Sequence, residues 1–247
     1  MRLSAGEALK HRARTAAFIL LAAVLLAYGA GNSFSAAAQA GQANAAFTPD
    51  KGKLRILQNG VEAGVETFEL APSGKTWIAR GETTVRIQGG GETRSTGQLR
   101  MTGDGTPLHY DWTAQAPAKV SGTVDFENGT AKTSINLGGK EPVLQDFKFP
   151  SPRVAILDNN LYDQYCILGR LYDWNAKGTQ TFPVLIPQDN TPGTVSLESL
   201  GSKTINGADL EGLRVRSADL EIEIYFDARH RLMRLEVPEA MVVVVRE

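Results

Sequence analysis

The sequence predicts a mainly β protein, built as a long curled antiparallel sheet (a half-barrel) wrapped around one α-helix. Apolar and polar side chains alternate in many short runs, and Gly, Asn and Pro residues separate the runs. One segment, between Val154 and Trp174, instead has helical spacing. A sheet of about ten or more strands must curl or split, and a single amphipathic helix can cover the concave face of a curled sheet. The alternative fold is a β-sandwich whose two halves divide near residue 150.

Residues 1–40 are typical of a secretory signal peptide. Four basic residues (Arg2, Lys10, Arg12 and Arg14) precede an apolar run over residues 15–31, and Ala38-Gln39-Ala40 supplies small residues for cleavage. The alternative is a retained membrane anchor. The apolar run is short for a span of about 20 residues, so cleavage near Ala40 is favoured.

This leader predicts a periplasmic or secreted protein that is not an integral membrane protein after cleavage. The small and polar residues 41–50 are expected to form a flexible segment, and residues 51–247 a single β-rich domain. The whole chain has a formal net charge of −1 and no basic cluster, which argues against a nucleic-acid partner. The oligomeric state is left open.

Seven strands are expected in the first half of the domain. Asn59-Gly60 and Asn128-Gly129 are strong hairpin signals between such strands. Asn128-Gly129-Thr130 also fits a glycosylation acceptor, but the bacterial character of the leader favours a turn. The seven strands are 53–58, 61–70, 77–87, 94–102, 108–114, 119–126 and 131–137.

A single helix is predicted over residues 157–173. Its apolar residues recur at spacings of four, four, three and four, which places them on one helical face. Asp158 or Asn159 is the expected N-cap. The residues of this face are Leu157, Leu161, Tyr165, Leu168 and Tyr172.

Six more strands are expected after the helix. The run 181–187 is bounded by proline and is expected at a sheet edge, and the apolar run 241–245 is expected to be a buried strand. The six strands are 181–187, 194–205, 213–218, 220–226, 232–237 and 241–245.

Two segments carry a family resemblance: Leu157–Asp163 (LDNNLYD) and the last hairpin, Ile224–Leu235 (IYFDARHRLMRL). The chain resembles bacterial envelope domains of unknown function whose last hairpin has a turn of the form hydrophobic-Asp-x-x-x-Arg-Leu. The resemblance spans roughly residues 50–247, and the architecture is similar to that of the LolA/LolB lipoprotein carriers. It implies a curled sheet around a helix and provides no catalytic residues, because a shared fold does not establish function.

The preferred functional hypothesis is non-catalytic binding of an apolar ligand, such as a lipid or a lipoprotein acyl chain, in the concavity of the sheet. The residues expected to line this cavity are Leu161, Tyr165, Leu168, Tyr172 and Trp174. The alternative interpretation is that these side chains are ordinary core. No cofactor or metal is expected, because two histidines in the mature chain and the single Cys166 do not form a zinc-binding set. Cys166 itself is interpreted as a small packing residue.

Two further hypotheses belong to other classes. The first is an exported hydrolase in which His109 and Asp111 share one face of a strand and serve as base and orienting acid. No nucleophile motif accompanies them. The second is a structural or assembly partner that acts through an exposed sheet edge. This hypothesis predicts an unpaired, uncharged edge and no pocket.

Overall fold

The computed structural model describes residues 47–86, 91–115, 118–139, 141–218 and 220–247. The predicted signal peptide therefore lies outside the described residues, as do residues 41–46. The last residues of the expected flexible segment belong to the fold. Phe47 is buried and its ring lies 5.7 Å from that of Trp77, and the first strand begins at Asp50.

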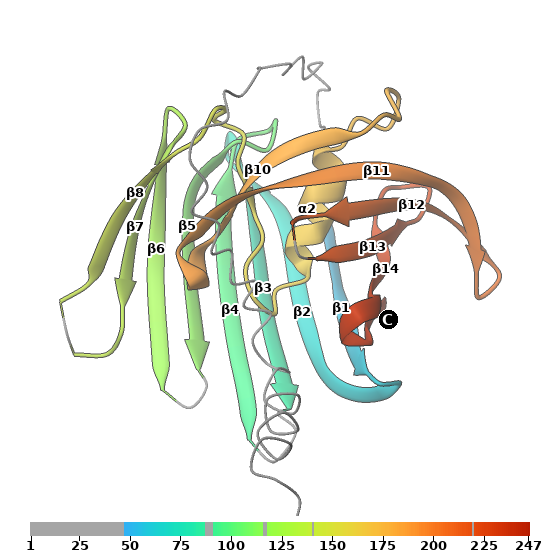
Figure 1. Cartoon of the computed structure of the whole chain (residues 1–247), viewed down its shortest axis with the longest axis horizontal. Helices are drawn as coiled ribbons and strands as arrows, with labels where there is room; N and C mark the ends of the chain where they lie inside the picture. The colour runs from blue at the N-terminus through green and yellow to red at the C-terminus, as the bar shows by residue number, and fades with distance from the viewer. Residues whose placement is uncertain (1–46, 87–90, 116–117, 140, 219) are drawn as a thin grey trace, which may run out of the picture.

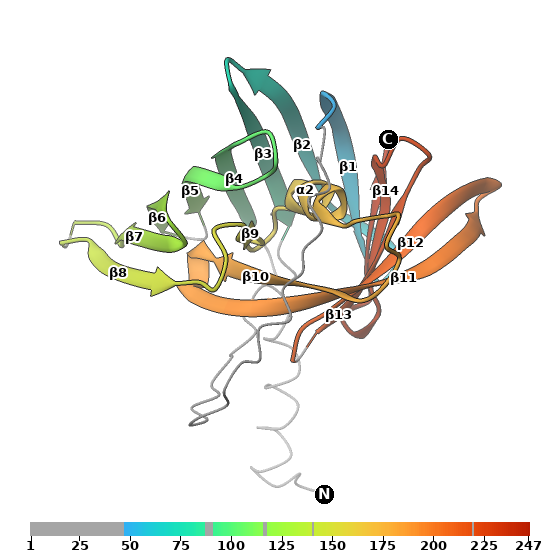
Figure 2. The same cartoon turned by 90° about the horizontal axis from the view of Figure 1, so that it is seen from above.

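All strands of the described chain belong to one mainly antiparallel sheet of 15 strands (Figures 1 and 2). One α-helix, α2 (Asp163–Leu171), lies inside the curl of this sheet, so the predicted fold class is confirmed. The sandwich alternative is wrong, because the described strands form a single sheet. The strands are β1 (Asp50–Gln58), β2 (Val61–Ser73), β3 (Thr76–Arg86), β4 (Glu92–Met101), β5 (Pro107–Gln115), β6 (Lys119–Glu127), β7 (Thr130–Asn136), β8 (Val143–Lys148), β9 (Ala155–Ile156), β10 (Gln180–Ile186), β11 (Thr191–Ile205), β12 (Ala208–Arg216), β13 (Glu221–Phe226), β14 (Leu232–Val237) and β15 (Val242–Arg246).

The sheet consists of two meanders joined in the middle. Its strand order runs from β8 down to β1, then from β15 down to β9. The ladder between β1 and β15 joins the two meanders, with Ile56 opposite Val244. Among the described strands, only β9 and β10 pair in parallel. Neighbouring strands are thus mostly consecutive in the sequence, which is why hairpin turns determine so much of the fold.

The Asn-Gly turns have the backbone that this dipeptide favours. Both residues have positive φ in Asn59-Gly60 (52° and 76°), in Asn128-Gly129 (48° and 77°) and in Asn206-Gly207 (52° and 81°). Positive φ at both central residues defines the type I′ turn, whose twist matches that of the flanking strands. The hairpins predicted at Asn59-Gly60 and Asn128-Gly129 are confirmed, and Asn206-Gly207 forms a third turn of the same kind between β11 and β12.

The predicted helix over 157–173 is wrong at its start. Residues 155–156 form β9, and the chain up to Leu161 is not helical. Asp158 does not cap the helix, because its carboxyl accepts hydrogen bonds from elsewhere in the fold. The spacing of Leu157 and Leu161 matched a helix by coincidence, since both side chains are buried from an irregular segment with a turn at Asn160.

Two strand predictions also need correction. Strand β8 was not expected, because its sequence VLQDFK places two apolar residues side by side and does not alternate. In β15 only Val244 is buried, although the whole run 241–245 was expected to be. Both faces of β15 are thus partly accessible.

A buried ion triad attaches the C-terminal end of α2 to the centre of the sheet. Asp50 of β1 accepts hydrogen bonds from Arg170 of α2 (3.2 Å) and from Arg246 of β15 (2.6 Å). The three side chains are only 3, 7 and 8 % exposed. Removing one partner of such a buried set leaves an uncompensated charge, at a cost of about 3–5 kcal/mol.

The two ends of the sheet meet through side chains. The short 3₁₀ helix η1 (Pro187–Asp189) follows β10, and the next residue is Asn190. The Asn190 carboxamide accepts a hydrogen bond from Thr133 of β7 (2.8 Å) and donates one to Gln145 of β8 (2.7 Å). The sheet therefore curls nearly into a ring without closing its backbone ladder. No helix of the described chain has the length and apolarity needed to cross a bilayer.

We expect Gly169→Ala to destabilise the fold. Gly169 lies in α2, and a Cβ there would overlap the ring of Phe226. Alanine gains about 1 kcal/mol of helix propensity, but overpacking a tight core costs about 1–3 kcal/mol. Denaturant unfolding should show the net loss. Gly103→Ala is the matched control, because nothing lies within 4 Å of its Cβ position; equal stability of the two variants would contradict the expected clash.

Candidate functional site

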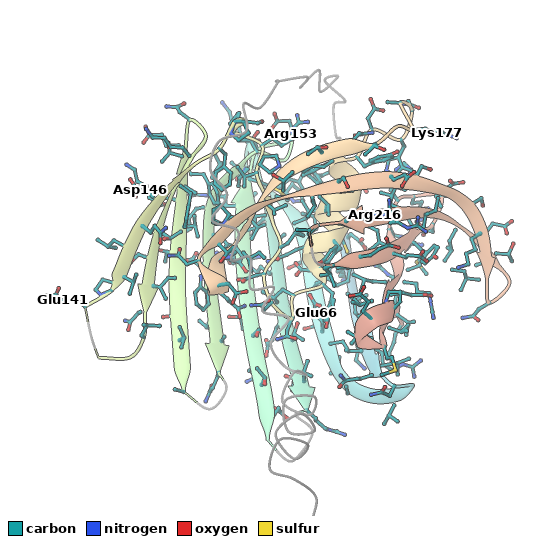
Figure 3. All side chains as sticks on the ribbon, in the orientation of Figure 1. Glu66, Glu141, Asp146, Arg153, Lys177 and Arg216 are labelled. Atoms are coloured by element: carbon teal, nitrogen blue, oxygen red, sulfur yellow. The ribbon has the colours of Figure 1, made fainter. Side chains whose placement is uncertain are left out.

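The N-terminal end of α2 is held by a carboxyl group from the sheet. Helix α2 has no capping side chain of its own. Instead the Glu66 carboxyl of β2 accepts hydrogen bonds from the backbone N–H groups of Tyr162 (2.8 Å) and Asp163 (2.9 Å). These N–H groups have no partner within the helix. Glu66 is fully buried and lies near the middle of the molecule, whereas Glu141 and Asp146 lie at its periphery (Figure 3).

Asp163 brings a second buried carboxyl next to Glu66. A glycine, Gly81 of β3, makes room for the pair: a Cβ there would lie 2.6 Å from Asp163 Oδ1 and 3.1 Å from Glu66 Oε1. Burial and the neighbouring carboxyl charge raise the pKa of Glu66 well above its usual value. Burial raises the pKa of Asp163 to about 6. Asp163 Oδ1 lacks a donor among the described residues, so a proton on one carboxyl supplies the missing hydrogen bond.

A third buried carboxyl, Asp158, lies in the segment before the helix. Its Oδ2 accepts a hydrogen bond from the Tyr110 hydroxyl (3.0 Å), and its Oδ1 accepts one from the backbone N–H of Gln188 (2.9 Å). The Gln164 amide donates to Tyr110 (3.0 Å), and its oxygen accepts from the backbone N–H of Asp158. Burial raises the pKa of Asp158 to about 7, although these hydrogen bonds oppose the shift. We call Glu66, Tyr110, Asp158, Asp163 and Gln164 the acid cluster.

An apolar pocket of about 100 Å³ lies beside the acid cluster. One wall is the segment from Leu157 to Tyr165, and the opposite wall is the inner face of β10–β15. Thr194 is exposed, while Asn160, Leu220 and Val242 are half-buried, so the pocket reaches the surface along this rim. The side chains of the opposite wall are mostly aliphatic: Val184, Ile186, Val195, Val215, Ile222, Leu235 and Val237.

The five residues predicted to bind a ligand separate into two groups. Leu161 and Tyr165 line the apolar pocket. Leu168 is fully buried in the core. The Tyr172 hydroxyl donates to the carbonyl of Gly178 (2.9 Å), and Trp174 donates to that of Gly169 (2.9 Å). Leu168, Tyr172 and Trp174 therefore lie outside the pocket lining.

Trp174 belongs to an aromatic stack at the other end of the helix. Its ring lies edge-on to Tyr172 (5.3 Å) and to Phe226 (5.6 Å) and is stacked on His230 (4.7 Å). Burial lowers the pKa of His230. This arrangement is packing at the turn between β13 and β14.

Sequence reasoning missed several residues of the site. Tyr162 lies one position after Leu161 and would point away from the predicted apolar helical face. Glu66 lies 97 residues before Asp163 along the chain, in a strand whose alternation gives no sign of a buried acid. The pocket wall formed by β10–β15 could be predicted only in part. The alternation of Leu220 and Ile222 predicted a strand, but it did not predict that this strand lines a pocket.

Both ring nitrogens of His109 contact carboxylates on the outer face of the sheet. Its Nδ1 lies 2.6 Å from Asp125 Oδ1, and its Nε2 lies 3.1 Å from Asp111 Oδ1. Burial lowers the pKa of His109, but the hydrogen bonds that its ring donates to Asp125 and Asp111 outweigh burial and raise it. Neither ring nitrogen is left for a nucleophile, so the geometry gives the hydrolase hypothesis no support.

The other polar features provide no recognisable chemistry. Cys166 is a free, buried thiol whose pKa is raised by burial and by nearby carboxyl charges. No group of three or more His, Cys, Asp or Glu residues that could hold a metal occurs in the described part of the chain. A polar groove of about 820 Å³ crosses the outer face of β2–β7, and Asp111 lines it.

Comparisons with known proteins identify a fold but no activity. The chain is similar to a beta-barrel-like protein of the domain of unknown function DUF1849 from Brucella abortus, with a TM-score of 0.55 and 7 % identity. The match covers 81 % of this chain and 95 % of that structure. No protein-family model and no curated protein matches the chain. The likeness agrees with the expected resemblance to an uncharacterised bacterial β-rich family and, at this identity, shows the fold alone.

We expect the acid cluster to make the protein less stable as pH rises. Asp158 ionises near its ordinary value of 3.8 in the unfolded chain and near 7 in the fold. Between these values the folded chain holds more protons, so the free energy of unfolding falls from pH 4 to pH 7. The fall is up to about 1.4 kcal/mol per pH unit for each such carboxyl.

Denaturant unfolding at several pH values measures this slope. Asp158→Asn should reduce it, because the amide does not titrate and still accepts at Oδ1. Asp146→Asn on the exposed face of β8 is the control and should leave the slope unchanged. A slope that is the same in wild type and Asp158→Asn would show that Asp158 does not titrate in this range.

Proposed function

We propose that this protein binds an apolar ligand, a lipid or an acyl chain, inside the curl of its sheet and does not catalyse a reaction. The observation that carries the proposal is the apolar pocket between residues 157–165 and strands β10–β15. Ligand sites are typically concave and mostly apolar with a few polar groups, and this pocket has that composition. A lipid or the acyl part of a lipoprotein is the partner that fits it.

The volume of the pocket limits the size of ligand that it can bind without a conformational change. An apolar cavity of about 150 Å³ accommodates benzene, so about 100 Å³ takes only a few carbon atoms. The pocket therefore suits the end of a chain or a short acyl group. A longer ligand has to extend past the rim at Asn160 and Thr194 or displace the segment before α2.

We also propose that the protein is exported to the periplasm or secreted after cleavage near Ala40. The basic region, apolar run and Ala-x-Ala triplet of residues 1–40 support this. The half-barrel around a helix supports the proposed similarity to the LolA/LolB carriers. N-terminal sequencing of the protein from its native cells should begin at Gly41. An intact leader in the membrane fraction would instead indicate a retained anchor.

A second candidate function is assembly through the edge strand β8. Its exposed apolar side chains favour this role: Leu144 is 71 % exposed and Val143 is 46 % exposed, and Leu137, just after β7, is 54 % exposed. Asp146 and Lys148 lie in the same strand. Charged residues in an edge strand discourage it from pairing with a strand of another chain. The edge is thus charged and a pocket is present, so the ligand-binding proposal is preferred.

Blocking the rim of the pocket should abolish ligand binding. Val242 is half-buried and lines the pocket, so Val242→Trp should fill its opening. Native mass spectrometry of the protein from its own cells, before and after solvent extraction, should show an extractable lipid on wild type and none on Val242→Trp.

Val243→Trp is the matched control, because Val243 is the next residue of β15 and does not line the pocket. It should retain the lipid. A wild-type protein that carries no lipid and whose pocket methyl resonances do not move with pentane would overturn the proposal.

A further inference from the structure

Two tyrosine side chains at the apolar pocket have no hydrogen-bond partner. Tyr162 and Tyr165 both line the pocket, and neither hydroxyl bonds to any residue of the described chain. Both side chains are half-buried, and neither hydroxyl is fully enclosed by the protein, so both are open to a ligand or to solvent. Two other tyrosines near α2 bond within the protein: Tyr110 bonds Asp158 and Gln164, and Tyr172 bonds Gly178.

The two hydroxyls belong to one face of the start of the helix. Tyr162 is the N-cap residue and Tyr165 is the third residue of α2, and the Tyr165 N–H donates to the Tyr162 carbonyl (3.0 Å). Side chains three residues apart are neighbours on a helix surface. Burial raises the pKa of both tyrosines, so both hydroxyls are protonated at neutral pH and can donate.

The surroundings select against a negatively charged ligand group. The Glu66 carboxyl bonds the Tyr162 N–H, and its charge contributes to the raised pKa of Tyr162. Asp158 also lines the pocket, and Asp163 adjoins Tyr162 along the chain. An anion placed here would lose its hydration without gaining a cationic partner among the residues that line the pocket. A neutral acceptor avoids that cost.

We propose that the hydroxyls of Tyr162 and Tyr165 bind the carbonyl oxygen of a neutral acyl group, an ester or an amide, whose aliphatic end lies among the valines of β10–β15. This inference rests on the proposed function and adds the chemical class of the ligand. The carbonyl accepts from the tyrosines, while Val184, Val195 and Val215 contact the aliphatic carbons. A free fatty acid is disfavoured because its carboxylate would lose its hydration in a pocket that offers no cationic side chain.

Three small aliphatic probes separate the possible ligand chemistries: methyl butanoate, butanoate and pentane. Titrations of the full mature protein, followed by the methyl resonances of pocket residues, should show that methyl butanoate binds more tightly than the other two. Tyr162→Phe and Tyr165→Phe should each weaken methyl butanoate by roughly 2- to 10-fold, the effect of one lost hydrogen bond. Pentane binding should not change in either variant.

Tyr172→Phe is the control, because its hydroxyl bonds Gly178 outside the pocket and its loss should leave all three titrations unchanged. Equal binding of methyl butanoate and pentane, or no effect of the pocket variants, would overturn the carbonyl assignment while the apolar pocket stands. Tightest binding by butanoate would overturn the preference for a neutral group. No binding of any probe, pentane included, would overturn the proposed function itself. If a variant loses stability, the comparison of the three probes on wild type decides the assignment.

Discussion

The hydrogen bonds between Glu66 and the start of α2 are the interaction on which the interior of this fold depends. A helix of nine residues is too short to be stable in water by itself. Its position is set from outside: the Glu66 carboxyl holds the N-terminal end, and Asp50 holds Arg170 at the C-terminal end. Both acids come from the adjacent strands β1 and β2. The helix is therefore attached at both ends to the same part of the sheet.

This attachment explains why the pocket lies where it does. With α2 fixed against β1–β3, the segment from Leu157 to Tyr162 has to cross towards the opposite wall, β10–β15. That segment is anchored by polar contacts at Asp158 and by the buried side chains of Leu157 and Leu161. The space left between it and the aliphatic wall is the apolar pocket. The acid cluster and the pocket thus both result from the attachment of α2 to β1–β3.

Most strands could be predicted from the sequence because their information is local. Alternation identifies a strand, and an Asn-Gly dipeptide fixes a type I′ hairpin, so both signals act over a few residues. The start of the helix could not be predicted in this way. Leu157 and Leu161 satisfy helical spacing, but pairing of Ala155 with Val184 and the bonds of Asp158 hold this segment in a non-helical conformation. Similarly, Leu161 and Tyr165 could be proposed for the site, whereas Glu66 and Tyr162 acquire their roles only through a contact between distant parts of the chain.

The ladder between β1 and β15 has a consequence for how the chain folds. Each meander is made of contacts close in sequence, which form quickly, but Leu54 and Arg246 meet across nearly the whole domain. Strand β15 is synthesised after every other strand of the sheet. The first meander therefore has β1 as an open edge until β15 is available to pair with it, and Arg246 reaches Asp50 only then. Until then the N-terminal half exposes an unpaired strand, which makes the nascent chain a natural client for chaperones.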